Sequence, residues 1–348
     1  MHPAATGLCL PYSPLPESTV TLSSRRLSCL VPRPSLSRLL AALSLGVAGL
    51  SVPLHASAQA TQASAQEEPF EPQLGRHGKD VMWLPTPDAL AERLMRMAGL
   101  GPQDVFVDLG AGDGRVSIAA ARDFQAQALG VEFDPKMVAV SQRNAQEAGV
   151  ADRTRFIEGD IFKADFSQAN IVFMYLLPQL NLRLRPTLLA MAPGTRLITH
   201  QFHMGRWEPD ETTLIAHRPG YLWIVPANAG GQWALSYQLG AGHGQATLDL
   251  SQTFQKLKGT VAMGELQTTL RQPRLTGDRI AFAFTDPQGH LREFTGVVTA
   301  DRIRGTVTGP EDSTSFTAKR VGAAPPVGGS EPPSQEELDA AAASLGSE

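Results

Sequence analysis

Between residues 83 and 226 the chain alternates short apolar runs with longer amphipathic segments, which predicts alternating strands and helices. Val105–Val107 is one such run, and the alanine-rich segment Arg115–Ala121 that follows it has helical character. Upstream, Leu90 and Leu94 recur at the spacing of one helix face. Strands and helices in this order are typical of an α/β domain with a parallel sheet.

From about Asn228 the pattern changes to strict alternation of apolar and polar residues, interrupted by turn signals such as Thr-Gly-Asp. Two similar units, RLTGDRIAFAF and VVTADRIRGTV, indicate a meander of short hairpins. Residues 228–320 are therefore predicted to form a small antiparallel β domain, either a barrel or a sandwich. The tail at 321–348 is predicted to be flexible and to carry a short helix.

The first predicted strand leads into a loop rich in glycine, with the sequence DLGAGDGR at residues 108–115. Gly110, Gly112 and Gly114 permit positive φ and a close approach of a ligand to the main chain. The amides at the start of the following helix are expected to face a nucleotide-like ligand. The dinucleotide motif G-x-G-x-x-G is not matched, because Arg115 stands at its last position.

Acidic residues end the next two predicted strands. Glu132 lies about twenty residues beyond the glycine loop, where a doubly wound fold places an acid on ribose hydroxyls. Asp134 precedes Pro135, so we interpret Asp134 as a helix cap with proline at the first helical position. Asp160 ends the following strand pattern, TRFIEGD.

These motifs together resemble the class I S-adenosylmethionine-dependent methyltransferases. The segments WLPTPDALAERLMRMAGL, DLGAGDGR, YLLP and PGTRLITHQF further resemble bacterial relatives of the mitochondrial lysine methyltransferases that modify the ATP synthase c subunit and the adenine nucleotide translocase. The resemblance covers about residues 83–226 and implies a Rossmann-like, seven-stranded methyltransferase domain, which we place at 81–227.

The resemblance implies S-adenosylmethionine as cofactor and assigns it a set of contacts. Asp108 and the loop would hold its amino-acid end, Asp160 its adenine amino group, and Thr86 would lie near its methionine moiety. Thr86 is interpreted equally well as the cap of a helix with Pro87 at its first position. The predicted cofactor-binding residues are Thr86, Asp108, Gly110, Ala111, Gly112, Asp113, Gly114, Glu132 and Asp160.

The acceptor side is expected where the fourth and fifth strands end, near Tyr175, His200 and His203. An amine acceptor must be neutral to attack, which requires a desolvated site or a nearby base. Many N-methyltransferases carry an acid or amide at the position of Tyr175, so a nucleobase amine is disfavoured and a protein lysine is the acceptor that the resemblance implies. His200 and His203 have the spacing of metal ligands, but strand alternation would put them on opposite faces, and no metal is predicted. Tyr175 and His200 remain the candidate catalytic residues.

The first 58 residues resemble a secretory signal peptide, with Arg38 before an apolar run at Leu39–Leu54 and small residues at Ala56–Ala58. That run is shorter than the roughly twenty residues of a membrane span, so no stable span is expected after cleavage. A polar linker is predicted at 59–80. Both cysteines, Cys9 and Cys29, fall in the leader, so the mature chain is predicted to lack disulfides and cysteine-based metal sites.

Export to the periplasm or beyond follows from this leader, although S-adenosylmethionine is a cytoplasmic metabolite. The alternatives are an uncleaved membrane anchor, or a cytoplasmic chain whose start codon lies later than Met1. The formal net charge of −4 gives no basic surface for nucleic acid. The sequence carries no signal for an oligomeric state.

Two functions from different classes are compatible with these motifs. The first is a methyltransferase with a β-rich C-terminal extension. The second is a non-catalytic protein of the cell envelope that binds S-adenosylmethionine or another nucleoside and uses its β domain to hold a partner.

Overall fold

The computed structural model of the protein describes residues 70–72, 75, 84–239, 242–310 and 312–343. The predicted leader at 1–58 and most of the predicted linker at 59–80 lie outside the described residues. Within the described part of the chain, no helix combines the length and the apolar character that crossing a membrane requires.

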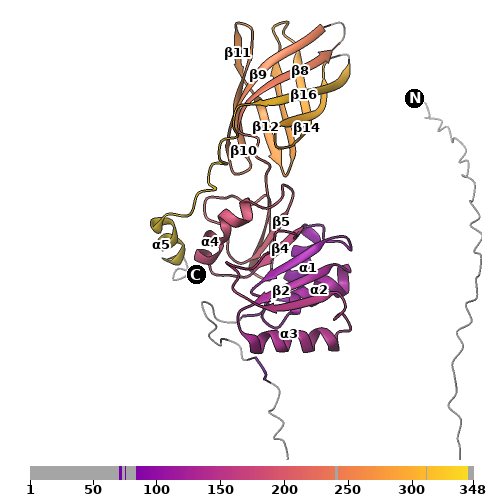
Figure 1. Ribbon diagram of the computed structural model, residues 1–348, viewed down its shortest axis with the longest axis vertical. Helices are drawn as coiled ribbons and strands as arrows, with labels where there is room; N and C mark the ends of the chain where they lie inside the picture. The colour runs from indigo at the N-terminus through magenta and orange to yellow at the C-terminus, as the bar shows by residue number, and fades with distance from the viewer. Residues whose placement is uncertain (1–69, 73–74, 76–83, 240–241, 311, 344–348) are drawn as a thin grey trace, which may run out of the picture. The chain divides into compact units, whose positions relative to one another are not determined.

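Seven strands between residues 105 and 224 form a mixed sheet with the order β3-β2-β1-β4-β5-β7-β6 (Figure 1). β1 to β5 are parallel to one another, and β7 runs antiparallel to both β5 and β6. β6 and β7 thus form an antiparallel hairpin at the edge of the sheet. The strands are β1 (Val105–Leu109), β2 (Gln127–Glu132), β3 (Thr154–Glu158), β4 (Ile171–Met174), β5 (Arg196–His200), β6 (Glu211–Ile215) and β7 (Arg218–Ile224).

Helices cover both faces of this sheet, because its central strands are apolar on both sides. In β4, Ile171 and Phe173 join the core beneath α1, α2 and α3, whereas Val172 and Met174 join the core beneath α4. The helices are α1 (Asp88–Met97), α2 (Arg115–Phe124), α3 (Pro135–Glu147) and α4 (Pro178–Leu189).

The two predicted helix caps have different outcomes. The Asp134 side chain accepts a hydrogen bond from the Lys136 amide, with Pro135 as the first residue of α3, so this cap is confirmed. The Thr86 cap is wrong: α1 begins one residue later than expected, Pro87 takes the cap position, and no side chain caps the helix. The Thr86 hydroxyl contacts His200 instead.

Nine further strands form a separate antiparallel sheet that is nearly closed into a barrel (Figure 1). Its order is β11-β10-β9-β8-β16-β15-β14-β13-β12, and the Leu270 amide between the two edge strands donates to the Gly259 carbonyl of β10 at 2.9 Å. The strands are β8 (Gly231–Leu239), β9 (Gly242–Thr253), β10 (Lys256–Met263), β11 (Leu266–Thr269), β12 (Arg271–Thr276), β13 (Arg279–Thr285), β14 (Leu291–Val298), β15 (Arg302–Thr308) and β16 (Ser313–Val321).

The predicted meander is confirmed, since the two similar sequence units form the hairpins β12–β13 and β14–β15. Their alternating apolar residues point inward and build an aromatic core. The ring of Phe294 lies 4.9 Å from Phe282, 4.9 Å from Phe284 and 5.1 Å from Phe316, measured between centroids.

The two sheets meet around the turn between β9 and β10. The Phe254 ring stacks on Trp207, with centroids 5.7 Å apart and planes within 4°. Lys256 forms an ion pair with Glu208 at 2.6 Å. The short helix predicted in the tail is α5 (Gln335–Ala343), which lies beside α4 (Figure 1).

Candidate functional site

The glycine loop lies between the carboxyl end of β1 and the start of α2. Gly110, Gly112 and Gly114 all have positive φ, at 85°, 57° and 80°, which other residues rarely adopt. A side chain at position 114 would also meet Ser141 of α3 at 2.7 Å and the Phe156 ring of β3 at 2.8 Å. The third glycine is thus required both by the backbone and by packing.

Most of the loop amides donate within the protein. The amides of Gly110 and Ala111 donate to the Val131 carbonyl, and the Gly112 amide donates to Glu132 at 2.8 Å. The Arg115 amide at the start of α2 donates to Asp113. Neighbouring carboxylates thus accept from the Gly112 and Arg115 amides, and the expectation that the loop amides face a ligand remains a prediction.

Three carboxylates gather around the loop. Asp108 in β1 is buried, and burial raises its pKa to about 7, with smaller contributions from repulsion by Glu132 and Asp113. The Ser117 hydroxyl donates to Asp108 at 3.1 Å and partly opposes this shift. Asp113 is paired with the Arg115 guanidinium at 2.7 Å. The excess of carboxylates suits a cationic ligand group.

Glu132 and Asp160 lie at the same edge of the sheet as the loop, because β1, β2 and β3 are parallel neighbours. Glu132 is the last residue of β2, and its second oxygen accepts a hydrogen bond from the Asp134 amide at 3.0 Å. Asp160 lies two residues beyond β3 and accepts from the Phe162 amide at 3.0 Å. Their assigned contacts with ribose and adenine remain predictions.

A second group of side chains joins the start of α1 to the ends of β4 and β5. The Thr86 hydroxyl lies 3.0 Å from Nδ1 of His200. The Tyr175 ring lies 3.9 Å from the His200 ring between centroids, and the Phe202 ring stacks on Tyr175 at 6.3 Å. The structure therefore brings three of the predicted residues, Thr86, Tyr175 and His200, into one cluster.

His200 is buried, and its Nε2 atom has no hydrogen-bond partner among the described residues. Burial and, to a smaller extent, the positive charge of Arg218 lower the pKa of His200 to about 4. The imidazole is consequently neutral near pH 7. With Nδ1 engaged by Thr86, Nε2 is the ring atom left to contact an acceptor.

The sequence pattern placed His200 and His203 on one strand with alternating side chains. This expectation is wrong, because β5 ends at His200 and His203 lies beyond it. His203 is exposed, and its ring meets the Tyr221 ring edge-on at 6.3 Å. Within the ranges that the structure describes, no cluster of three or more His, Cys, Asp or Glu residues has the geometry of a metal site.

Arg218, the first residue of β7, was not predicted from the sequence. Its guanidinium lowers the pKa of the Tyr175 hydroxyl by charge and hydrogen bonding, against a larger upward shift from burial. A lone arginine before a proline in an edge hairpin carries no motif that would have identified it.

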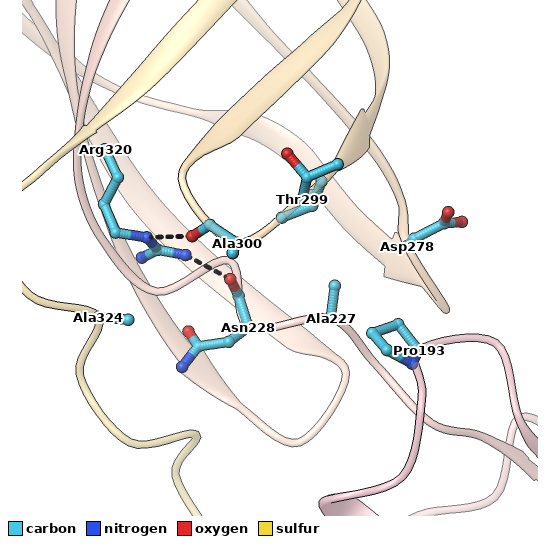
Figure 2. Close-up of a pocket in the computed structure, with 9 residues that line it drawn as sticks. Pro193, Ala227, Asn228, Asp278, Thr299, Ala300, Arg320 and Ala324 are labelled. Atoms are coloured by element: carbon cyan, nitrogen blue, oxygen red, sulfur yellow. Dashed lines mark hydrogen bonds between the residues drawn. The ribbon is translucent and has the colours of Figure 1, made fainter. Parts of the chain in front are cut away.

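A separate hollow of about 530 Å³ lies between the Pro193 turn and the β domain (Figure 2). Arg320 crosses its wall and donates to the backbone carbonyls of Ala300 and Asn228 at 3.0 and 2.6 Å, while stacking on Trp233. None of the predicted site residues lines this hollow. The hydrogen bonds of Arg320 therefore hold backbone segments of the β domain together beside this hollow.

A family model matches part of the seven-stranded domain. Residues 108–211 match the family model of the ANTKMT methyltransferase domain. A protein-lysine N-methyltransferase of Saccharolobus islandicus is 37% identical over 151 residues, which are 42% of this chain and 94% of that protein.

A Mus musculus lysine N-methyltransferase of the ATP synthase c subunit is 36% identical over 134 residues, 38% of this chain; the chain spans 53% of that protein. A crystal structure of an RNA methyltransferase from Salinibacter ruber in complex with S-adenosyl-L-homocysteine is 45% identical. It covers 41% of this chain and 94% of its own, with a TM-score of 0.40.

Proposed function

We propose that the protein methylates lysine side chains of another protein, because the chain belongs to the family of the ANTKMT methyltransferase domain. This family uses S-adenosylmethionine as the methyl donor. One observation carries this proposal. The protein-lysine methyltransferase of Saccharolobus islandicus is 37% identical to this chain over 94% of its own length. The strand order β3-β2-β1-β4-β5-β7-β6 supports the class I assignment.

The residues around the glycine loop fit S-adenosylmethionine. The cofactor carries two positive groups, the sulfonium and the amino group, and Asp108, Asp113 and Glu132 supply the opposing charge. Glu132 would exchange the hydrogen bond of the Gly112 amide for those of the ribose hydroxyls. The three positive-φ glycines keep the loop free of side chains on the ligand side.

When bound, the cofactor supplies an electrophilic methyl group: the lysine nitrogen forms the new N–C bond while the C–S bond breaks and its electron pair stays on sulfur. The protein's own contribution is to orient the acceptor and to exclude water. Tyr175 and Phe202 provide stacked aromatic faces for an aliphatic lysine chain. His200 offers a neutral, buried nitrogen that hydrogen-bonds to the acceptor amine.

The test incubates the full chain and methyl-labelled S-adenosylmethionine with membrane and soluble protein fractions of a bacterial cell, followed by residue-level mass spectrometry. We expect methylated lysine in a protein band. Label confined to lipids, RNA or small molecules would contradict a protein-lysine acceptor and leave methyl transfer standing. Tight cofactor binding without label in any fraction would favour the non-catalytic binding protein.

We also propose that residues 1–58 direct the protein out of the cytoplasm, on the strength of the apolar run at Leu39–Leu54 and the small residues after it. A fusion of residues 1–66 to a reporter that is active only outside the cytoplasm should be exported and cleaved near Ala58. A reporter retained in the cytoplasm would contradict export.

A further inference from the structure

Two buried polar side chains that lie 114 positions apart in sequence contact each other. Thr86 is 3% exposed and His200 is fully buried, and the Thr86 hydroxyl lies 3.0 Å from Nδ1 of the His200 ring. A polar group in the core destabilises the fold unless it is hydrogen-bonded. The contact therefore gives each of these two groups a partner at a place where water does not reach.

The backbone around Thr86 leaves its hydroxyl little freedom. Thr86 stands between Pro85 and Pro87, and a proline fixes its own φ and confines the residue before it to extended conformations. Pro87 precedes α1 directly, and its carbonyl accepts hydrogen bonds from the amides of Leu90 and Ala91, both at 3.0 Å. The start of α1 thus holds the Thr86 hydroxyl in one place.

The sheet beneath α1 allows a close approach of this helix. Gly220 of β7 lies directly opposite His200 of β5. A Cβ atom at Gly220 would lie 2.8 Å from Leu94 and 3.2 Å from Leu90, both of which belong to α1. The glycine lets α1 pack closely on the strand beside His200, and this packing brings Thr86 within hydrogen-bonding distance of the ring.

Thr86 anchors one side of the imidazole and leaves the other side available. Nδ1 faces the hydroxyl, whereas Nε2 is buried and has no hydrogen-bond partner among the described residues. The Tyr175 ring packs on the imidazole at 3.9 Å between centroids, tilted by 33°. Turning the imidazole over would exchange each ring nitrogen with a carbon, so the hydroxyl selects the orientation that keeps Nε2 in its place.

We infer that Thr86 is a positioning residue that acts through His200, fixing the ring so that Nε2 accepts a hydrogen bond from the lysine amine. This inference rests on the proposed lysine substrate. The attacking amine keeps its lone pair for the methyl group, so it contacts the ring only by donating an N–H. A hydroxyl can accept from Nδ1 as well as donate to it, so the anchor persists when the proton lies on Nδ1 and the lone pair on Nε2. Burial lowers the pKa of His200 to about 4, so the ring stays neutral and takes no proton from the substrate.

The experiment measures initial rates of methyl-lysine formation in a solubilised membrane protein fraction at saturating S-adenosylmethionine, using the full chain. Thr86→Val keeps the shape of the side chain and removes the hydroxyl, so we expect the rate to fall about tenfold, as for the loss of one hydrogen bond. Thr86→Ser restores a hydroxyl and should recover most of the rate. Thr195, a buried threonine directly before β5 and at the end away from His200, provides the matched control, and Thr195→Val should leave the rate unchanged.

A double-mutant cycle distinguishes an action through His200 from a general structural role. His200→Asn keeps a polar atom near the position of Nδ1 and removes Nε2, so adding Thr86→Val to it should lower the rate no further. By NMR, the His200 ring nitrogens of the wild type should show the chemical shifts of a single tautomer, and those of Thr86→Val an average of two. The calorimetric affinity for S-adenosylmethionine should stay the same in every variant, which also shows that each variant is folded.

The outcomes separate this inference from the proposed function. A further fall in rate in the double variant, or averaged tautomers already in the wild type, would overturn the inference and leave the proposed function intact. Weaker S-adenosylmethionine binding by Thr86→Val with an unchanged saturated rate would also overturn it, because Thr86 would then be a cofactor contact. A wild-type chain that methylates only non-protein acceptors would overturn both.

Discussion

The guanidinium of Arg185 in α4 is fully buried and donates two hydrogen bonds to the carboxylate of Glu337 in α5, at 2.6 and 3.0 Å. These residues lie 152 positions apart, with the whole β domain between them in sequence. The tail of the chain thus returns from the β domain to supply the counter-charge of a core arginine in the methyltransferase domain. Arg185 also lies over the Phe254 ring at the junction of the two sheets.

Removing Glu337 should therefore destabilise the methyltransferase domain. Glu337→Ala leaves a buried guanidinium without its partner, and we expect the free energy of unfolding to fall by about 3 kcal/mol in thermal or urea melts. Glu336→Ala changes a neighbouring exposed residue and should have almost no effect. Equal effects of the two variants would show that α5 acts only through its helical content.

The same pair predicts a pH dependence with a definite sign. The hydrogen bonds from Arg185 lower the pKa of Glu337 below its ordinary value. A carboxyl with a lowered pKa adds stability above its unfolded-state pKa and loses it as the pH falls through the folded-state value. The wild type should lose stability below about pH 4.5 more steeply than Glu337→Gln, as measured by melting temperature across pH 3–6.

For Asp108 we expect a pH dependence of stability of the opposite sign. Burial raises the pKa of Asp108 from 3.8 to about 7, so ionising this carboxyl costs the folded state free energy. The free energy of unfolding should therefore fall as the pH rises from about 4 to about 7. Asp108→Asn should be more stable than the wild type at pH 8, by at most about 4 kcal/mol. The same variant should bind S-adenosylmethionine more weakly, since it lacks the charge that opposes the cationic cofactor.

Asp123→Asn at the exposed end of α2 is the control for Asp108→Asn and should change neither melting temperature nor cofactor affinity appreciably. Wild-type affinity, measured by calorimetry, should also rise between pH 6 and 8 as Asp108 ionises. A destabilised Asp108→Asn chain at pH 8 would contradict the raised pKa.

The part of the site that local sequence determines was predictable. Three alternating glycines have to adopt positive φ, an acid at the end of β2 has to lie beside the loop of β1, and Asp134 before Pro135 has to cap α3. These relationships span about thirty residues and follow from strand order alone. The alternating pattern after Asn228 predicted the antiparallel sheet for the same reason.

The relationships that failed or were missed depend on long-range packing. Thr86 has the residue type and the Pro87 neighbour of a cap, but its hydroxyl turns to His200, which is 114 positions away. Arg218 becomes the first residue of β7 because the Ala216–His217 turn, with positive φ at both residues, folds β7 back along β6, and nothing local in that turn favours such a conformation. A pattern of neighbours in sequence contains no information about either contact.

Gly114, the third glycine of the loop, allows the cost of backbone strain to be measured separately from the cost of side-chain overpacking. Gly114→Ala combines a positive φ of 80° with contacts below 3 Å to Ser141 and Phe156, so we expect a loss of several kcal/mol of stability and of cofactor binding. Gly149→Ala has a similar φ of 69° but meets nothing within 4 Å, so it should cost about 1 kcal/mol and leave binding intact. Similar losses in both variants would assign the requirement at position 114 to backbone conformation alone.

Glu132 tests whether the loop and the cofactor compete for one carboxylate. Its two oxygens accept hydrogen bonds from the Gly112 and Asp134 amides, so Glu132→Ala removes a brace of the unliganded loop as well as the predicted ribose contact. We expect Glu132→Ala to lower the free energy of unfolding by about 1–2 kcal/mol and to weaken S-adenosylmethionine binding by about 1.5–3 kcal/mol.

Glu132→Gln keeps an acceptor for one of these two amides and places an N–H donor against the other, so it should lose cofactor binding with a smaller loss of stability than Glu132→Ala. Glu158, which lies directly opposite Glu132 on β3 and is exposed, provides the matched control, and Glu158→Ala should change neither quantity. A Glu132→Gln chain with normal cofactor affinity would mean that the carboxylate only braces the loop, and ribose recognition would then have to come from another residue.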